Sequence, residues 1–77
     1  MWRSTLRSSF SPTRFRNARE GAGHSREALG RLIDRSYFTI EAWERGKSVP
    51  SIRTACMVAD TLGVPVDAFF EQLEVAV

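Results

Sequence analysis

Only two residues, Asp34 and Arg35, separate two segments of this 77-residue chain that both have helical periodicity. In the first segment, which begins at Ser25, apolar residues recur at the three- and four-residue spacing of a helix. The second begins at Ser36, and a serine can cap a helix with its side-chain oxygen. Because so short a connection folds two helices back on each other, the sequence predicts a helix-turn-helix.

Serine, proline and glycine residues also mark where the other predicted helices begin or end. Ser11 and Pro12 form a cap followed by proline at the first helical position, which is where a helix tolerates it. Ser51 and Pro65 open two further helices, whereas no alternating run of β-branched residues is long enough to predict a strand. We therefore expect an all-α, compact five-helix domain over residues 11–74, a flexible basic arm at residues 1–10 and a C-terminal tail at residues 75–77.

Charge is distributed unevenly along the chain, although the net charge is only +2. Residues 1–19 contain five arginines and no acid, and residues 60–77 contain four acids and no base. The basic end suits a polyanion, and the acidic end is expected to face away from it.

The residue types offer little for catalysis. His24 is the single histidine, and there is neither a glycine-rich phosphate loop nor a pair of carboxylates at a cleft-forming position. Cys56 is the single cysteine, which excludes an internal disulfide, and its helical position predicts that it is buried. We expect no enzyme activity, no cofactor and no metal. No stretch approaches the roughly 20 apolar residues of a membrane span, and we expect a cytoplasmic, nucleoid-associated protein.

Residues 15–70 resemble the phage repressor and Cro-like (lambda-repressor-like) helix-turn-helix family without a gap. The most specific part of the match is the run Glu44, Arg45, Gly46 and Lys47 at the end of the third helix. The other matching residues are Arg19, Gly23, Ser25, Glu27, Leu29, Ser36, Thr39, Ile40, Pro50, Ser51, Ala59, Leu62, Gly63, Val64, Asp67 and Phe70.

The resemblance implies a DNA-binding transcriptional regulator, a repressor, that inserts residues 36–45 into the major groove. The implied partner is double-stranded DNA with a palindromic operator, bound by a homodimer. The residues implied to face bases are Tyr37, Phe38, Thr39 and Ala42, and those implied to contact phosphate are Ser25, Arg26, Ser36, Lys47 and Ser48. Arg19 and Glu44 are implied to form an ion pair beneath the reading helix.

The contacts expected of Tyr37 and Phe38 each have two alternatives. Tyr37 can contact DNA or lie against Ile40 and complete the core. Phe38 is expected to point outward beside Ala42, where it would contact thymine methyl groups or a protein partner. The alternative function is accordingly a protein-interaction module with this fold, such as an antitoxin or a phage protein that binds a host factor.

The acidic C-terminal segment is the expected dimer interface. Adjacent helical residues point about 100° apart, so two neighbouring rings cannot both enter a small core. The sequence therefore predicts that a partner covers some of Phe69, Phe70, Leu73 and Val75. The alternative is that both rings are buried within the monomer and the tail frays.

Overall fold

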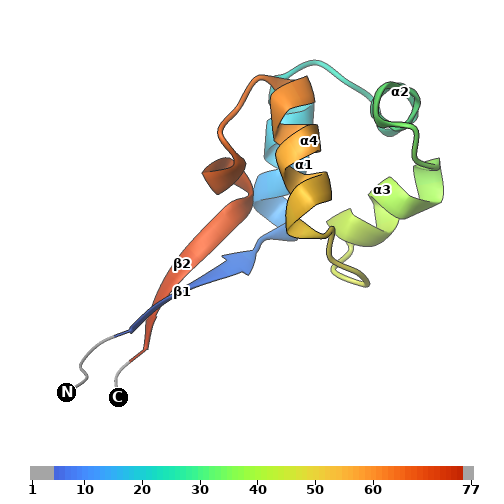
Figure 1. The fold of residues 1–77 in the computed structure, drawn as a ribbon. Helices are drawn as coiled ribbons and strands as arrows, with labels where there is room; N and C mark the ends of the chain where they lie inside the picture. Colours follow the sequence, from blue (N-terminus) through green and yellow to red (C-terminus); the bar gives the residue numbers. More distant parts are fainter. Residues whose placement is uncertain (1–4, 76–77) are drawn as a thin grey trace.

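The computed structural model describes residues 5–75 of the chain, and a mostly helical body carries a two-stranded sheet (Figure 1). Four α-helices and a short 3₁₀ helix, η1, lie between the two strands in the sequence. In chain order the elements are β1 (Thr5–Phe10), α1 (Pro12–Gly21), α2 (Arg26–Ile33), α3 (Tyr37–Glu44), α4 (Ile52–Leu62), η1 (Val66–Phe69) and β2 (Phe70–Val75).

Each of the four α-helices begins where the sequence predicts a serine cap. The side-chain oxygens of Ser11, Ser25, Ser36 and Ser51 each accept a hydrogen bond from a backbone N–H three residues later, at 3.0–3.2 Å. These bonds satisfy one of the N–H groups that a helix start leaves without a partner.

The core lies between the helices and is centred on aromatic contacts of Phe15. The Phe15 ring centroid is 5.7 Å from that of Trp43 and 5.3 Å from that of Phe69, both nearly edge to face. Phe15 therefore joins α1 to α3 and to η1. The buried apolar residues are Phe15, Leu29, Ile33, Ile40, Trp43, Ala55, Val58, Ala59, Leu62 and Phe69.

The predicted fifth helix is wrong. Only Val66–Phe69 form a helical turn, and the chain then extends as β2. The expected arm also differs, since Thr5–Phe10 form β1, while residues 1–4 lie outside the described part. Of the expected tail, Val75 ends β2 and residues 76–77 lie outside the described part.

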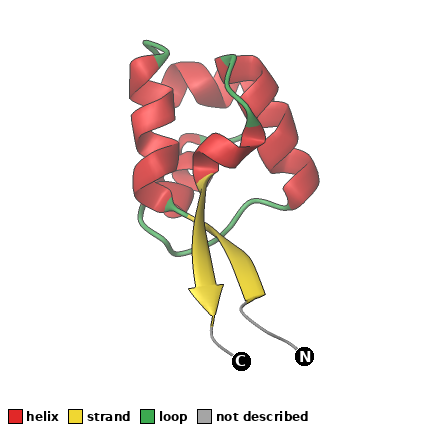
Figure 2. Ribbon diagram, turned by 90° about the vertical axis from the view of Figure 1, so that its left-hand side faces the viewer, coloured by secondary structure: helices red, strands yellow, loops and turns green. Residues whose placement is uncertain are grey.

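The two strands pair antiparallel, from Thr5 opposite Val75 to Phe10 opposite Phe70, and project from the helical body as a ribbon (Figure 2). At the base of this ribbon, the Phe10 and Phe70 ring centroids are 6.0 Å apart, and Phe10 also packs on Phe15. The ribbon is therefore anchored to the core at one end.

Cys56 is exposed, which contradicts its predicted burial. The buried face of α4 consists of Ala55, Val58, Ala59 and Leu62. Cys56 follows Ala55 directly, and a step of one residue turns its side chain about 100° away from that face.

Close packing in the turn between α2 and α3 explains an unusual glycine. A Cβ on Gly30 would lie 2.6 Å from the backbone oxygen of Arg35, which is too close for any side chain. Asp34 ends α2 in the left-handed conformation, with φ of 58°, where most L-residues are strained. The Arg35 N–H then donates to the Gly30 carbonyl at 2.9 Å. The turn therefore requires a glycine at position 30 and tolerates an aspartate at position 34.

We predict opposite effects of two substitutions in this turn. Gly30→Ala should lower the free energy of unfolding by about 1–2 kcal/mol, because the steric conflict exceeds the gain in helix propensity of about 1 kcal/mol. Asp34→Gly should raise it by about 0.5 kcal/mol, because glycine relieves the left-handed strain. Urea denaturation measures both, and a Gly30→Ala protein as stable as the parent would show that the turn can move aside.

Candidate nucleic-acid interface

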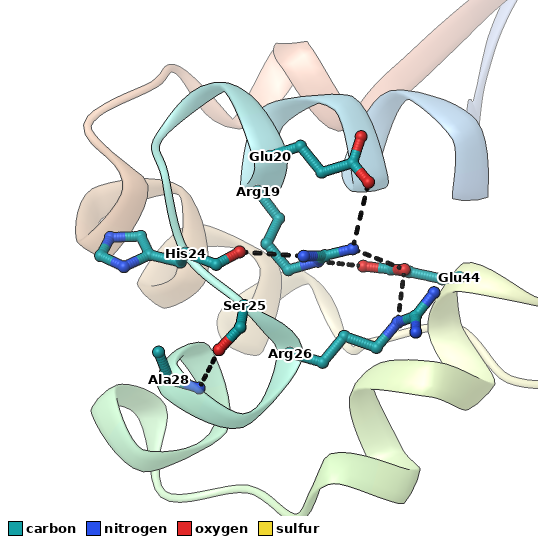
Figure 3. Close-up of polar contacts among 7 residues, drawn as sticks. All are labelled: Arg19, Glu20, His24, Ser25, Arg26, Ala28 and Glu44. Atoms are coloured by element: carbon teal, nitrogen blue, oxygen red, sulfur yellow. Dashed lines mark hydrogen bonds and ion pairs between the residues drawn. The ribbon is translucent and has the colours of Figure 1, made fainter.

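The carboxylate of Glu44, at the end of α3, receives hydrogen bonds from two arginines on two other helices (Figure 3). Arg19 on α1 donates from Nε to Oε2 at 2.5 Å and from Nη2 to Oε1 at 3.1 Å. Arg26 on α2 donates from Nε to Oε1 at 2.9 Å. These three residues, here called the Glu44 cluster, join α1, α2 and α3 at one point.

Arg19 also holds the loop between α1 and α2. Its Nη1 donates to the backbone oxygen of His24 at 2.9 Å, and its Nη2 lies 3.7 Å from a carboxylate oxygen of Glu20. The side chains of Arg19 and Glu44 are only 7% and 2% exposed, whereas that of Glu20 is 60% exposed. The structure thus brings together the pair that the resemblance implies and buries it.

Glu44 and Arg26 each favour the charged form of the other. Burial alone would raise the pKa of Glu44, but the hydrogen bonds and charges of Arg19 and Arg26 outweigh it and lower the pKa. The hydrogen bond to Glu44 likewise raises the pKa of Arg26.

The sequence did not reveal the contact between Arg26 and Glu44. Arg26 was expected to contact phosphate, and the two residues are 18 positions apart with no pattern that links them. The Arg26 side chain is 31% exposed, so part of it stays accessible although its Nε binds Glu44.

The residues expected to face bases lie at the first turns of α3 and differ in exposure. Phe38 is 74% exposed, and Tyr37, Thr39 and Ala42 are partly buried. The Tyr37 ring meets the Phe38 ring edge-on, with centroids 5.5 Å apart, and the Arg26 Cζ lies 6.0 Å from the Tyr37 centroid. Tyr37 therefore lies between Arg26 and Phe38 at the surface.

The residues expected to contact phosphate divide into caps and loop residues. Ser25 and Ser36 use their side-chain oxygens to cap α2 and α3, next to backbone N–H groups that favour anions. Lys47 and Ser48 are exposed in the loop after α3, and the Lys47 N–H donates to the Ala42 carbonyl at 2.9 Å. Together with Arg26, these residues come from both helices of the motif and from the loop that follows.

The four residues of the expected dimer interface lie in η1 and β2. Phe69 is the ring that enters the core, at 0% exposure, so it is not available to a second chain, and the interface formed by the other residues stays a prediction. Phe70 is partly buried against Phe10, and Leu73 and Val75 belong to β2.

No helix in the part of the chain that the structure describes combines the length and the apolar character needed to cross a membrane.

A family described as a helix-turn-helix domain matches residues 13–69, from the first turn of α1 to the end of η1. The chain therefore belongs to this helix-turn-helix family of DNA-binding domains. The match covers the helical body and leaves both strands of the ribbon outside. No curated protein and no solved structure matches the chain.

We predict that Glu44→Gln destabilises the protein at neutral pH by about 3 kcal/mol, because it leaves the buried Arg19 without its counter-charge. The pKa of Glu44 is lowered in the folded state, so its contribution is complete above the unfolded pKa and is lost as the pH falls through the folded pKa. The stability difference from the parent should therefore be constant above about pH 5.5 and shrink below about pH 4.

Urea denaturation across this pH range provides the measurement. Glu20→Gln is the matched control, because Glu20 is exposed and contacts Arg19 only at 3.7 Å, and it should change stability little. A difference between Glu44→Gln and the parent that stays the same at every pH would contradict the assigned role of the carboxylate.

Proposed function

We propose that this chain is a sequence-specific transcriptional regulator, a repressor of the phage repressor and Cro-like kind, that inserts α3 into the major groove of DNA. The major groove is wide enough to admit an α-helix. One side of α3 supplies Ile40 and Trp43 to the core, and its last residue, Glu44, is fixed by two arginines. A helix held in this way can present its other side to a partner without reorganising.

The exposure of Phe38 is the observation that carries this proposal. A large aromatic side chain at 74% exposure, on a helix whose opposite side is buried, marks a contact surface. In a major groove it would pack on thymine methyl groups, with Thr39 and Ala42 beside it. The helix would then read methyl groups and groove shape more than a pattern of hydrogen bonds.

Phosphate contacts would supply most of the affinity. Ser25, Arg26 and Ser36 stand at the starts of the two helices, and Lys47 and Ser48 follow α3. The ribbon leaves the body on the side away from α2 and α3 (Figure 1), so β1 lies apart from this surface. A homodimer on a palindromic operator would double these contacts and block polymerase.

The second candidate is a protein-interaction module. The exposed Phe38 packed against Tyr37 would suit an apolar partner, and Glu41 on the same helix would repel phosphate. Binding to a random duplex distinguishes the two functions: binding that weakens steeply with salt supports DNA, and no binding at low salt supports a protein partner.

Lys47→Ala should weaken binding to all duplexes by a similar factor and reduce the salt slope by about one unit, since a phosphate contact carries no sequence information. Lys47 is a cleaner test than Arg26, because Arg26 also binds Glu44. Arg16→Ala, an exposed arginine on α1, is the control and should leave the slope unchanged. An effect of Lys47→Ala confined to one sequence would reject the phosphate contact.

Phe38→Ala should change sequence preference, with a loss of about 1–3 kcal/mol at thymine-containing positions. Selection from random duplexes before and after the substitution measures this change. Leu32→Ala removes another exposed apolar side chain, 57% exposed on α2, and should leave the preference as it is. An unaltered preference in the Phe38→Ala protein would assign Phe38 to a protein partner.

A further inference from the structure

We infer that the outer edge of β1 binds β1 of a second copy of this chain, so that two ribbons join into a four-stranded antiparallel sheet. Within residues 5–75 the sheet has only two strands of six residues each, and both project from the helical body in two perpendicular views (Figures 1 and 2).

Such a ribbon has a physical reason to bind another strand. A two-stranded sheet is marginally stable in water unless further strands or packing against a helix support it, and the ring contacts at Phe10 and Phe70 anchor only the base of this ribbon to the core. The outer edges of β1 and β2 each carry backbone groups that pair readily with a further strand. A second copy offers an identical strand that is already ordered.

The register of the ribbon selects a particular pairing. An antiparallel arrangement centred on Ser8 sets Arg7 opposite Ser9 of the second copy. Within each ribbon Ser9 pairs with Glu71, so Arg7 of one copy and Glu71 of the other occupy one row, separated only by a small residue. They are two strand spacings apart, roughly 9.6 Å, which is about one Debye length at physiological salt, so their opposite charges attract each other.

The next row of residues is apolar where the β1 strands of the two copies would meet. Leu6 would stand opposite Phe10 of the second copy, and Phe10 pairs with Phe70 in its own ribbon. No two like charges stand directly opposite each other, which is the arrangement that would destabilise a sheet.

The charges of β2 disfavour pairing of two copies through the outer edge of that strand. Joining two β2 strands would bring Glu71 and Glu74 of both copies into adjacent strands, and β2 contains no basic residue. The strand β1 contains Arg7 and no acid. The pairing through β1 therefore sets opposite charges in a row, whereas the pairing through β2 gathers like charges.

The proposed sheet leaves α3 free. Antiparallel pairing places the two helical bodies at opposite ends of the sheet and relates them by a two-fold axis, which is the symmetry of a palindromic site. The dimer itself does not depend on DNA binding, so it can be tested in the absence of DNA.

Disulfide trapping tests the pairing directly. In a Cys56→Ser background, which removes the exposed native thiol, Ser8→Cys should form a covalent dimer under mild oxidation. The two Ser8 positions would stand opposite each other with Cβ atoms about 5 Å apart. Gln72→Cys is the matched control, because Gln72 pairs with Ser8 in the same ribbon but would be roughly 14 Å from its counterpart.

The expected result is cross-linking at least about tenfold faster for Ser8→Cys than for Gln72→Cys, together with sedimentation of the parent chain as a dimer. Equal or faster cross-linking of Gln72→Cys would overturn the pairing through β1. A parent chain that sediments as a monomer at its highest soluble concentration, or a dimer that neither variant traps, would overturn it as well. Trapping of Ser8→Cys without any DNA binding would instead reject the proposed function and leave the dimer standing.

Discussion

A buried carboxylate determines how the two helices of the motif are held. Removing Glu44 from water is costly, and the hydrogen bonds from Arg19 and Arg26 offset that cost. The donors come from different helices, so the carboxylate is satisfied only when α1, α2 and α3 are correctly placed. Apolar contacts of similar size can stabilise a fold equally well, so we expect the carboxylate to contribute chiefly by favouring one arrangement of the three helices.

Arg26 connects the Glu44 carboxylate, at the end of α3, to the aromatic residues at the start of α3. Its Nε binds Glu44 at the last residue of the helix, and its guanidinium carbon lies 6.0 Å from the centre of the Tyr37 ring at the first residue. The Tyr37 ring in turn supports Phe38 edge to face. In the turn between α2 and α3, Gly30 lets the backbone of Arg35 lie close against α2, as the short turn requires. The exposed ring of Phe38 is therefore supported by contacts that begin in the protein interior.

Local signals in the sequence predicted the starts of the four α-helices, although they also predicted a fifth helix where the structure has only a 3₁₀ turn followed by β2. No sequence signal linked residues that are distant along the chain. A serine cap acts within three residues, so Ser11, Ser25, Ser36 and Ser51 could each be recognised from the neighbouring sequence. The pairing of Thr5–Phe10 with Phe70–Val75 joins opposite ends of the chain, and neither segment alternates in a way that predicts a strand. The contact of Arg26 with Glu44 is equally non-local, and the exposure of Cys56 depends on a single step around α4.

If the start of α3 contacts DNA, amide chemical-shift mapping should locate the contact there. A random duplex added at low salt should produce its largest shift changes at Tyr37–Ala42, with smaller changes at Ser25, Arg26, Lys47 and Ser48. The amides of the ribbon should change little, because it lies on the side away from α2 and α3. Shift changes concentrated in Thr5–Phe10 and Phe70–Val75, or no changes at any duplex concentration, would contradict the account.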